Sequence, residues 1–80
     1  MIVKILAFGI AKDIINGQIT NLELDHGATV GILKEKLTAT YPDFKKLRSL
    51  SIAVNESYQN DDFEIGENDE IVIIPPVSGG

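Results

Sequence analysis

Cysteine is absent from the 80-residue chain. Its absence excludes disulfide bonds, thiolate metal sites and cysteine nucleophiles. Small secreted domains commonly depend on disulfides, whereas proteins of a reducing compartment do not. We therefore expect a cytoplasmic protein that is stabilised by one hydrophobic core.

Basic residues are few: seven lysines and arginines stand against twelve aspartates and glutamates, for a net charge of −5. Nucleic-acid binding requires clustered basic side chains that displace counterions. Only Lys45, Lys46 and Arg48 cluster here, so no nucleic-acid partner is expected. An acidic protein of this kind is instead attracted to basic protein surfaces.

Long apolar runs are also lacking. The longest, IVIIPPV, is far shorter than the roughly 20 residues of a membrane-spanning helix. The opening MIVKILAFGIA is apolar, but no basic region precedes it and Lys4 lies inside it. We expect a buried strand there and not a signal peptide, and we predict no membrane association.

Motifs for catalysis and for metal or nucleotide binding are missing as well. The one histidine, His26, lies in a polar turn and is better explained as solvated than as a catalytic base. No serine lies in a nucleophile elbow, and there is no GxGxxG or P-loop. Six of the twelve acids lie in NDDFEIGENDE, but an EF-hand loop starting at Asn60 or Asp61 fails at Ile65 or Phe63. The chain is therefore expected to bind no metal and no cofactor of its own.

The pattern of apolar residues predicts one α+β domain over residues 1–74. Residues 2–8 and residues 18–24 alternate with period two, which predicts two strands. We expect a hairpin whose connection holds a short helical turn, and Asn16-Gly17 tolerates the positive φ angles of a tight turn. The side chains of the first strand expected to face the core are Val3, Ile5 and Ala7, and one face of the second strand carries Thr20, Leu22 and Leu24.

The main helix is predicted to begin after Thr29, whose hydroxyl can accept a hydrogen bond as the N-cap, and to end at Pro42. Its apolar stripe has spacings of three, four and four. The following DFKKLRSL is expected to be an irregular turn. The residues expected to point inward from the helix and this turn are Val30, Leu33, Leu37, Tyr41, Phe44, Leu47 and Leu50.

Short strands are predicted at residues 51–54 and 70–74, with few apolar side chains between them. The last strand is apolar on both faces, which is typical of a central strand or of one half-exposed at a docking site. The predicted fold is a small mixed sheet with one main helix packed on one face.

Residues 75–80, PPVSGG, have the composition of an extended tail. Two prolines favour a stiff polyproline-type segment, and six residues at about 3 Å each reach nearly 20 Å. Two final glycines carry no side chain, so the tip can thread a narrow channel; a frayed end is the alternative. The residues predicted to thread into a partner are Pro75, Pro76, Val77, Ser78 and Gly79, with Gly80 at the tip.

The functional group expected at the tip is the terminal carboxylate of Gly80. A carboxylate resists nucleophilic attack because of its charge, and it reacts after conversion to an acyl-adenylate. An enzyme that carries out this step must enclose the carbonyl next to ATP and Mg²⁺, which suits a thin glycine tip. The activated acyl carbon can then accept a sulfur or an amine, so the tail is predicted to be a carrier arm.

The chain opens with VKILAFGIAKDI, contains IAVN at residues 52–55 and ends NDEIVIIPPVSGG. These segments resemble the ubiquitin-like β-grasp fold and, within it, the small subunits of molybdopterin synthase (MoaD-like sulfur carriers). That family ends G-D-E-V, two bulky apolar residues and P-P-V-x-G-G. Here Asn68 replaces the usual glycine and Ile73-Ile74 stand where aromatics are common. The resemblance covers the whole chain.

The resemblance implies a sulfur carrier for molybdenum cofactor biosynthesis. A ubiquitin-activating-type enzyme would use ATP and Mg²⁺ to adenylate Gly80, and a sulfur donor protein would convert it to a thiocarboxylate. The tail would then enter the large synthase subunit, within a heterotetramer, and pass its sulfur to a cyclic pyranopterin phosphate. The catalytic groups are expected on the large subunit, so this chain would be a non-catalytic subunit.

A docking patch is predicted beside the root of the tail. Leu6 and Phe8 share the wetter side of the first strand with Lys4, and the resemblance implies that the first and last strands are neighbours. Ile74, just before the prolines, is the expected contribution of the last strand. The alternative is that this face is a second side of the core.

Two other functions share this outline. ThiS-like sulfur carriers of thiamine synthesis have the same fold and Gly-Gly end, but they usually lack P-P-V before it and are shorter through the middle. A ubiquitin-like modifier or adaptor would join Gly80 to a lysine or leave it unused. A lysine-linked adduct in cells would indicate this second alternative.

Overall fold

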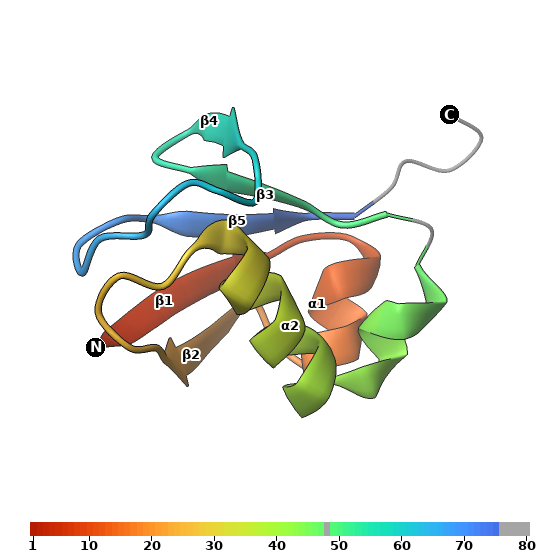
Figure 1. Ribbon diagram of the computed structural model, residues 1–80. Coiled ribbons are helices and arrows are strands. Elements are labelled where there is room, and N and C mark those ends of the chain that lie inside the picture. Colours follow the sequence, from red (N-terminus) through yellow and green to blue (C-terminus); the bar gives the residue numbers. More distant parts are fainter. Residues whose placement is uncertain (48, 76–80) are drawn as a thin grey trace.

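The computed structural model describes residues 1–47 and 49–75. The described part contains the predicted hairpin, main helix and later strands (Figure 1). Its elements are β1 (Ile2–Ala7), α1 (Ile10–Ile15), β2 (Ile19–Glu23), α2 (Val30–Thr40), the 3₁₀ helix η1 (Pro42–Lys46), β3 (Ser51–Val54), β4 (Ser57–Gln59) and β5 (Ile71–Ile74).

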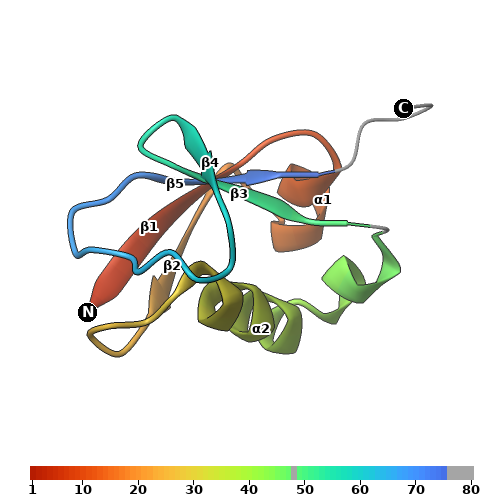
Figure 2. The same cartoon turned by 45° about the horizontal axis from the view of Figure 1, so that its top comes forward.

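The strands form one mixed sheet in the order β2-β1-β5-β3-β4. β1 runs parallel to β5, and the other neighbouring pairs are antiparallel. Both α-helices lie on the same side of this sheet in Figures 1 and 2. The α+β class and the packing of the main helix on one face of the sheet are therefore confirmed.

The predicted core face of the first strand is confirmed, but the connection of the hairpin differs from a tight turn. Val3 and Leu22, which face each other in the β1–β2 pairing, are both buried. In the connection Asn16 has a φ of 60° and caps the C-terminus of α1, while Gly17 has no positive φ. The Gly17 N–H donates to the Lys12 carbonyl at 3.1 Å. A helix cap with one left-handed residue thus takes the place of a two-residue turn.

The main helix α2 begins where the sequence predicts. The Thr29 hydroxyl accepts a hydrogen bond from the Ile32 N–H at 3.3 Å, which satisfies a donor of the first helical turn. The stripe toward the sheet is fully buried at Val30, Leu33 and Leu37. Within residues 1–47 and 49–75, no helix is long and apolar enough to cross a membrane.

The segment after α2 is more regular than the predicted irregular turn. Pro42 begins the 3₁₀ helix η1, because its fixed φ suits the first position of a helix and its missing N–H is not needed there. Phe44 is buried as expected. The Tyr41 hydroxyl lies 2.9 Å from the Thr20 hydroxyl, so a hydrogen bond joins the end of α2 to β2.

The last strand, β5, is central in the sheet, between β1 and β3. Ile71 and Ile73 are fully buried on the helix side, whereas Val72 and Ile74 are half-buried on the other side. Its central position explains why the strand is apolar on both faces.

The edge strand β4 is not predicted by the sequence pattern, because Ser57–Gln59 has no apolar alternation. It forms because Asn55 and Glu56, with φ angles of 51° and 71°, make a two-residue turn that returns the chain along β3. The pairing places Tyr58 opposite Ala53.

Candidate functional site

The described chain reaches Pro75, the first residue after β5. The other predicted tail residues, Pro76, Val77, Ser78, Gly79 and Gly80, lie outside the described residues. The part of the candidate site that the structure describes is therefore the root of the tail and the sheet face beside it.

The root of the tail lies where two parallel strands end. Ala7 is level with Ile73 in the β1–β5 pairing, so continuing this register brings Phe8 level with Ile74. Next along the chain, Gly9 lies beside Pro75: a Cβ added to Gly9 would be 3.7 Å from the Pro75 Cγ. Figure 1 shows the chain leaving the C-terminal end of β5 on the side of the molecule where α1 lies.

Gly9 has a backbone conformation that only glycine adopts readily, with φ 58° and ψ −136°. These angles suit the first central position of a type II′ turn, and the Ala11 N–H donates to the Phe8 carbonyl at 3.2 Å across it. Gly9 therefore directs the chain from β1 into α1 beside Pro75. Gly9 is not among the residues predicted from the sequence; a lone glycine between the strand pattern and the helix pattern is the signal that could have found it.

The face of the sheet opposite the helices, called here the outer face, carries an apolar row that crosses all five strands. Pairing places Leu6 between Ile19 and Val72, and Ala53 between Val72 and Tyr58. The two ends of the row are the most open, because Ile19 is 52% exposed and Tyr58 is 68% exposed. This outer row consists of Ile19, Leu6, Val72, Ala53 and Tyr58.

The predicted patch residues lie on or beside this face. Leu6 is in the outer row, Ile74 shares its side of β5 with Val72, and Phe8 follows β1 with 54% of its surface exposed. Leu6 and Ile74 are half-buried, but neither packs against the hydrophobic core cluster of the described residues. The predicted docking patch does not contain Val72, Ile19 or Tyr58. Strand alternation places Val72 on the outer face, but only the strand pairing places Ile19 and Tyr58 in the same row.

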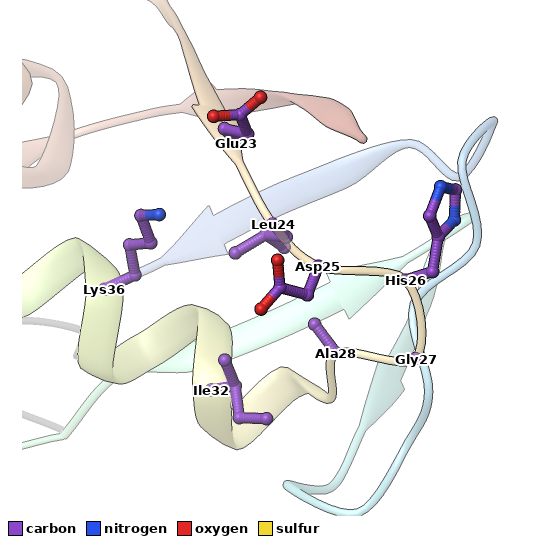
Figure 3. A pocket seen from close by; sticks show the side chains of 8 residues that line it. All are labelled: Glu23, Leu24, Asp25, His26, Gly27, Ala28, Ile32 and Lys36. Carbon is purple, nitrogen blue, oxygen red and sulfur yellow. The ribbon is translucent and has the colours of Figure 1, made fainter.

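The one histidine lies in the turn between β2 and α2, beside a hollow of about 260 Å³. His26 is exposed, and Figure 3 shows its ring on the far side of this loop from Lys36. Asp25 and Glu23 point in different directions in the same view. The side chains around this hollow therefore do not converge as an acid–base pair would.

The acidic segment of residues 60–70 is held by hydrogen bonds within the protein. Asp69 accepts from the Asn55 side-chain amide at 2.8 Å and from the Gly66 N–H at 2.7 Å. Asp61 forms an ion pair with Lys34 at 2.7 Å. Among residues 1–47 and 49–75, no group of three or more His, Asp or Glu side chains has the arrangement of a metal site.

Comparison with known proteins adds a family and named relatives. The model of the ThiS family matches residues 5–80. A molybdopterin synthase sulfur carrier subunit from Dictyostelium discoideum is 39% identical over 82 residues, covering 96% of this chain and 94% of the relative. A protein of the same description from Arabidopsis thaliana is 32% identical over 79 residues, covering 98% and 82%.

Solved structures share the fold. A putative molybdopterin converting factor subunit 1 from Pyrococcus furiosus is 27% identical with a TM-score of 0.87, covering 96% of this chain and 99% of its own. The ubiquitin of Caldiarchaeum subterraneum is 25% identical with a TM-score of 0.67, covering 100% and 98%. A complex of subunits 1 and 2 of the Helicobacter pylori molybdopterin-converting factor contains a chain with 23% identity and a TM-score of 0.68, covering 100% of both. The fold is thus the ubiquitin-like β-grasp.

Proposed function

Because the chain belongs to the ThiS family, we propose that it is the sulfur carrier subunit of a molybdopterin synthase. One observation carries this proposal: two relatives that are more than 30% identical over nearly the whole chain both have this description. The ThiS family match alone leaves the pathway open, since thiamine synthesis uses carriers with the same fold. The P-P-V before the final glycines favours the molybdopterin pathway.

The proposed chemistry takes place at the carboxylate of Gly80. A carboxylate oxygen attacks the α-phosphate of ATP, and pyrophosphate leaves to give an acyl-adenylate. A sulfur donor protein supplies a hydrosulfide equivalent from a persulfide, with a thiol as the reductant, and this sulfur displaces AMP. The product is a thiocarboxylate whose nucleophilic sulfur was absent from the original tail.

In the proposed transfer step, the large synthase subunit encloses the tail and binds the cyclic pyranopterin phosphate. The thiocarboxylate sulfur bonds to a carbon of this substrate as the bond from that carbon to an oxygen breaks, and the oxygen leaves with the electron pair and takes up a proton or stays on the phosphate. Water then cleaves the acyl–sulfur bond, which leaves the sulfur on the substrate and restores the carboxylate. The catalytic groups belong to the large subunit, in a heterotetramer, and this chain contributes the sulfur. A complex of subunits 1 and 2 from Helicobacter pylori supports a large-subunit partner.

The described residues have two roles in this proposal. Gly9, which lies beside Pro75, positions the start of the tail. The patch of Leu6, Phe8 and Ile74 docks both the activating enzyme and the large subunit. A tip without side chains can then reach an enclosed site. In this proposal the activating enzyme uses ATP and Mg²⁺, and this chain needs no cofactor of its own. The cysteine-free sequence suits a cytoplasmic location.

Intact-mass spectrometry after incubation with the activating enzyme, ATP, Mg²⁺ and a sulfur donor tests the proposal. The chain should gain the mass difference of one oxygen replaced by sulfur, and fragmentation should place the sulfur at Gly80. The loaded chain should then convert the pyranopterin substrate when the large subunit is added. Sulfur at another residue, or Gly80 joined only to lysines of other proteins, would overturn the proposal in favour of another function.

A further inference from the structure

A groove lies on the outer face at the end of β1 that is remote from the tail root. It exists because β5 begins only at Ile71, which pairs with Ile5, so that the residues before Ile71 diverge from the start of β1. Figures 1 and 2 show this loop, in blue, at the same end of the molecule as the N-terminus. The groove has a volume of about 360 Å³ and is lined by Ile2, Lys4, Leu6, Glu67, Asn68, Asp69 and Glu70.

The floor of the groove is formed by Ile2, Lys4 and Leu6 of β1, and its apolar side chains continue into the outer row. Ile2 is 65% exposed. Among the described residues, no other large aliphatic side chain is more exposed. Leu6 lines the groove and also belongs to the outer row. Exposed apolar side chains next to an apolar sheet face are typical of a protein–protein contact.

The rim of the groove is acidic, and two of its carboxylates form no ion pair among the described residues. Asp69 is occupied by its hydrogen bonds to Asn55 and Gly66. Glu67 and Glu70 are exposed, and in residues 1–47 and 49–75 their carboxylates form no ion pair, with Lys4 or with any other base. Two carboxylates are thus available to a partner.

We propose that this groove receives a segment of the large synthase subunit in which an apolar side chain is flanked by lysine or arginine. This inference rests on the proposed function. The apolar side chain would cover Ile2 and Leu6, and the basic one would pair with Glu67 or Glu70. Charge complementarity favours this occupant over a second copy of the chain, because each copy has a net charge of −5 and an acidic rim.

The distance from the groove to the tail root is short enough for one partner protein to cover both. From Ile2 to Phe8, β1 and its next residue extend about 20 Å. A partner that covers both the groove and the tail root therefore spans a length usual for a specific interface. Contact at both ends would hold the carrier in one orientation while its tail is enclosed.

The test compares binding of wild type and the double variant Glu67→Lys/Glu70→Lys to the purified large subunit from the same organism. The matched control is Glu35→Lys/Asp43→Lys, which makes the same change of charge at exposed residues of α2 and η1. At low ionic strength the groove variant should associate at least about tenfold more slowly than wild type and control. In roughly 0.5 M salt the difference should nearly disappear, because exposed charges are then screened.

The variant Ile2→Ala should instead raise the dissociation rate, and this effect should not depend on salt.

Three results would overturn the inference: equal binding of wild type and groove variant, an equal loss in the control, or a loss of binding confined to the activating enzyme. Sedimentation analysis adds a fourth, a wild-type dimer that the groove variant cannot form. Failure of wild type itself to bind the large subunit would contradict the proposed function. Normal wild-type binding with an unaffected groove variant would contradict only the groove.

Discussion

Asn55 donates a 2.8 Å hydrogen bond from its side-chain amide to the Asp69 carboxylate, although the two residues are 14 positions apart. The Asn55 side-chain oxygen accepts from the Glu70 N–H at 2.9 Å, and the Asn55 N–H donates to the Glu70 carbonyl at 2.9 Å. One residue at the β3–β4 turn therefore fixes the loop that leads into the central strand. It also fixes the acidic wall of the groove.

Asn55→Ala should lower the free energy of unfolding by about 1–3 kcal/mol, because it removes two side-chain hydrogen bonds. It also places alanine at a φ of 51°, a left-handed conformation that asparagine tolerates better than alanine does. Asn55→Gly is the control, since it removes the same bonds but accepts the positive φ, so it should lose less. Denaturant titration measures both. A loss below about 0.5 kcal/mol in the alanine variant would mean that the bonds contribute little net stability.

Leu37→Ala should lower the free energy of unfolding by about 2–4 kcal/mol, because Leu37 is fully buried between α2 and the sheet and its removal leaves a cavity. This is a large share of the stability of a small domain. Glu35→Ala, exposed on the same helix, should change stability by less than about 0.5 kcal/mol. Similar values for the two variants in a urea titration would contradict the packing described for α2.

Gly9→Ala should lower the free energy of unfolding by about 1–2 kcal/mol, because its φ of 58° is unfavourable for a residue with a Cβ. Contact with Pro75 is not the cause, since 3.7 Å is an ordinary van der Waals distance. The matched control is Gly17→Ala, where φ is not positive and the nearest atom would be 4.0 Å from the new Cβ. Thermal unfolding of both variants should show a loss only at Gly9.

Phe8→Glu should weaken binding to the activating enzyme and to the large subunit by about tenfold or more, since an apolar contact is replaced by a charge. Folding should be preserved because Phe8 is 54% exposed. Ile32→Glu is the control, with 47% exposure on α2 and therefore on the other side of the sheet. Normal binding by Phe8→Glu, or an unfolded protein, would count against the docking patch.

Deletion of Gly80 should nearly abolish adenylation, because it moves the terminal carboxylate back by one residue, about 3 Å. A displacement of 1 Å already lowers the reaction rate about a hundredfold. Gly79→Val should also fail, for a different reason: the carboxylate keeps its reach, but a β-branched side chain must enter a narrow channel. Thermal stability should be unchanged in both. The mass assay for the thiocarboxylate measures loading, and a truncated chain that loads like wild type would show that the tip is not the reacting group.

Local signals in the sequence were sufficient for most elements. Period-two alternation predicted β1 and β2, the spacing of Val30, Leu33 and Leu37 predicted the buried face of α2, and Thr29 predicted its start. Each signal depends on residues within a few positions of one another, which is why it can be recognised without a structure. β4 has no such signal: it forms through a turn at Asn55 and Glu56 and through pairing with β3.

The chemistry proposed for the tip follows from a local motif, P-P-V-S-G-G, and from the family that this motif resembles. It does not depend on how distant parts of the chain pack together. The surroundings of the tail root, by contrast, depend on how distant strands pair. Gly9 meets Pro75 because β1 and β5 are parallel neighbours, and Ile19, Leu6, Val72, Ala53 and Tyr58 form one row only through the registers of four strand pairs. Strand order and register are set by burial of the whole inner face at once, since a slip by one residue would turn every core side chain outward. Strand order and register therefore cannot be predicted from any single segment of the sequence.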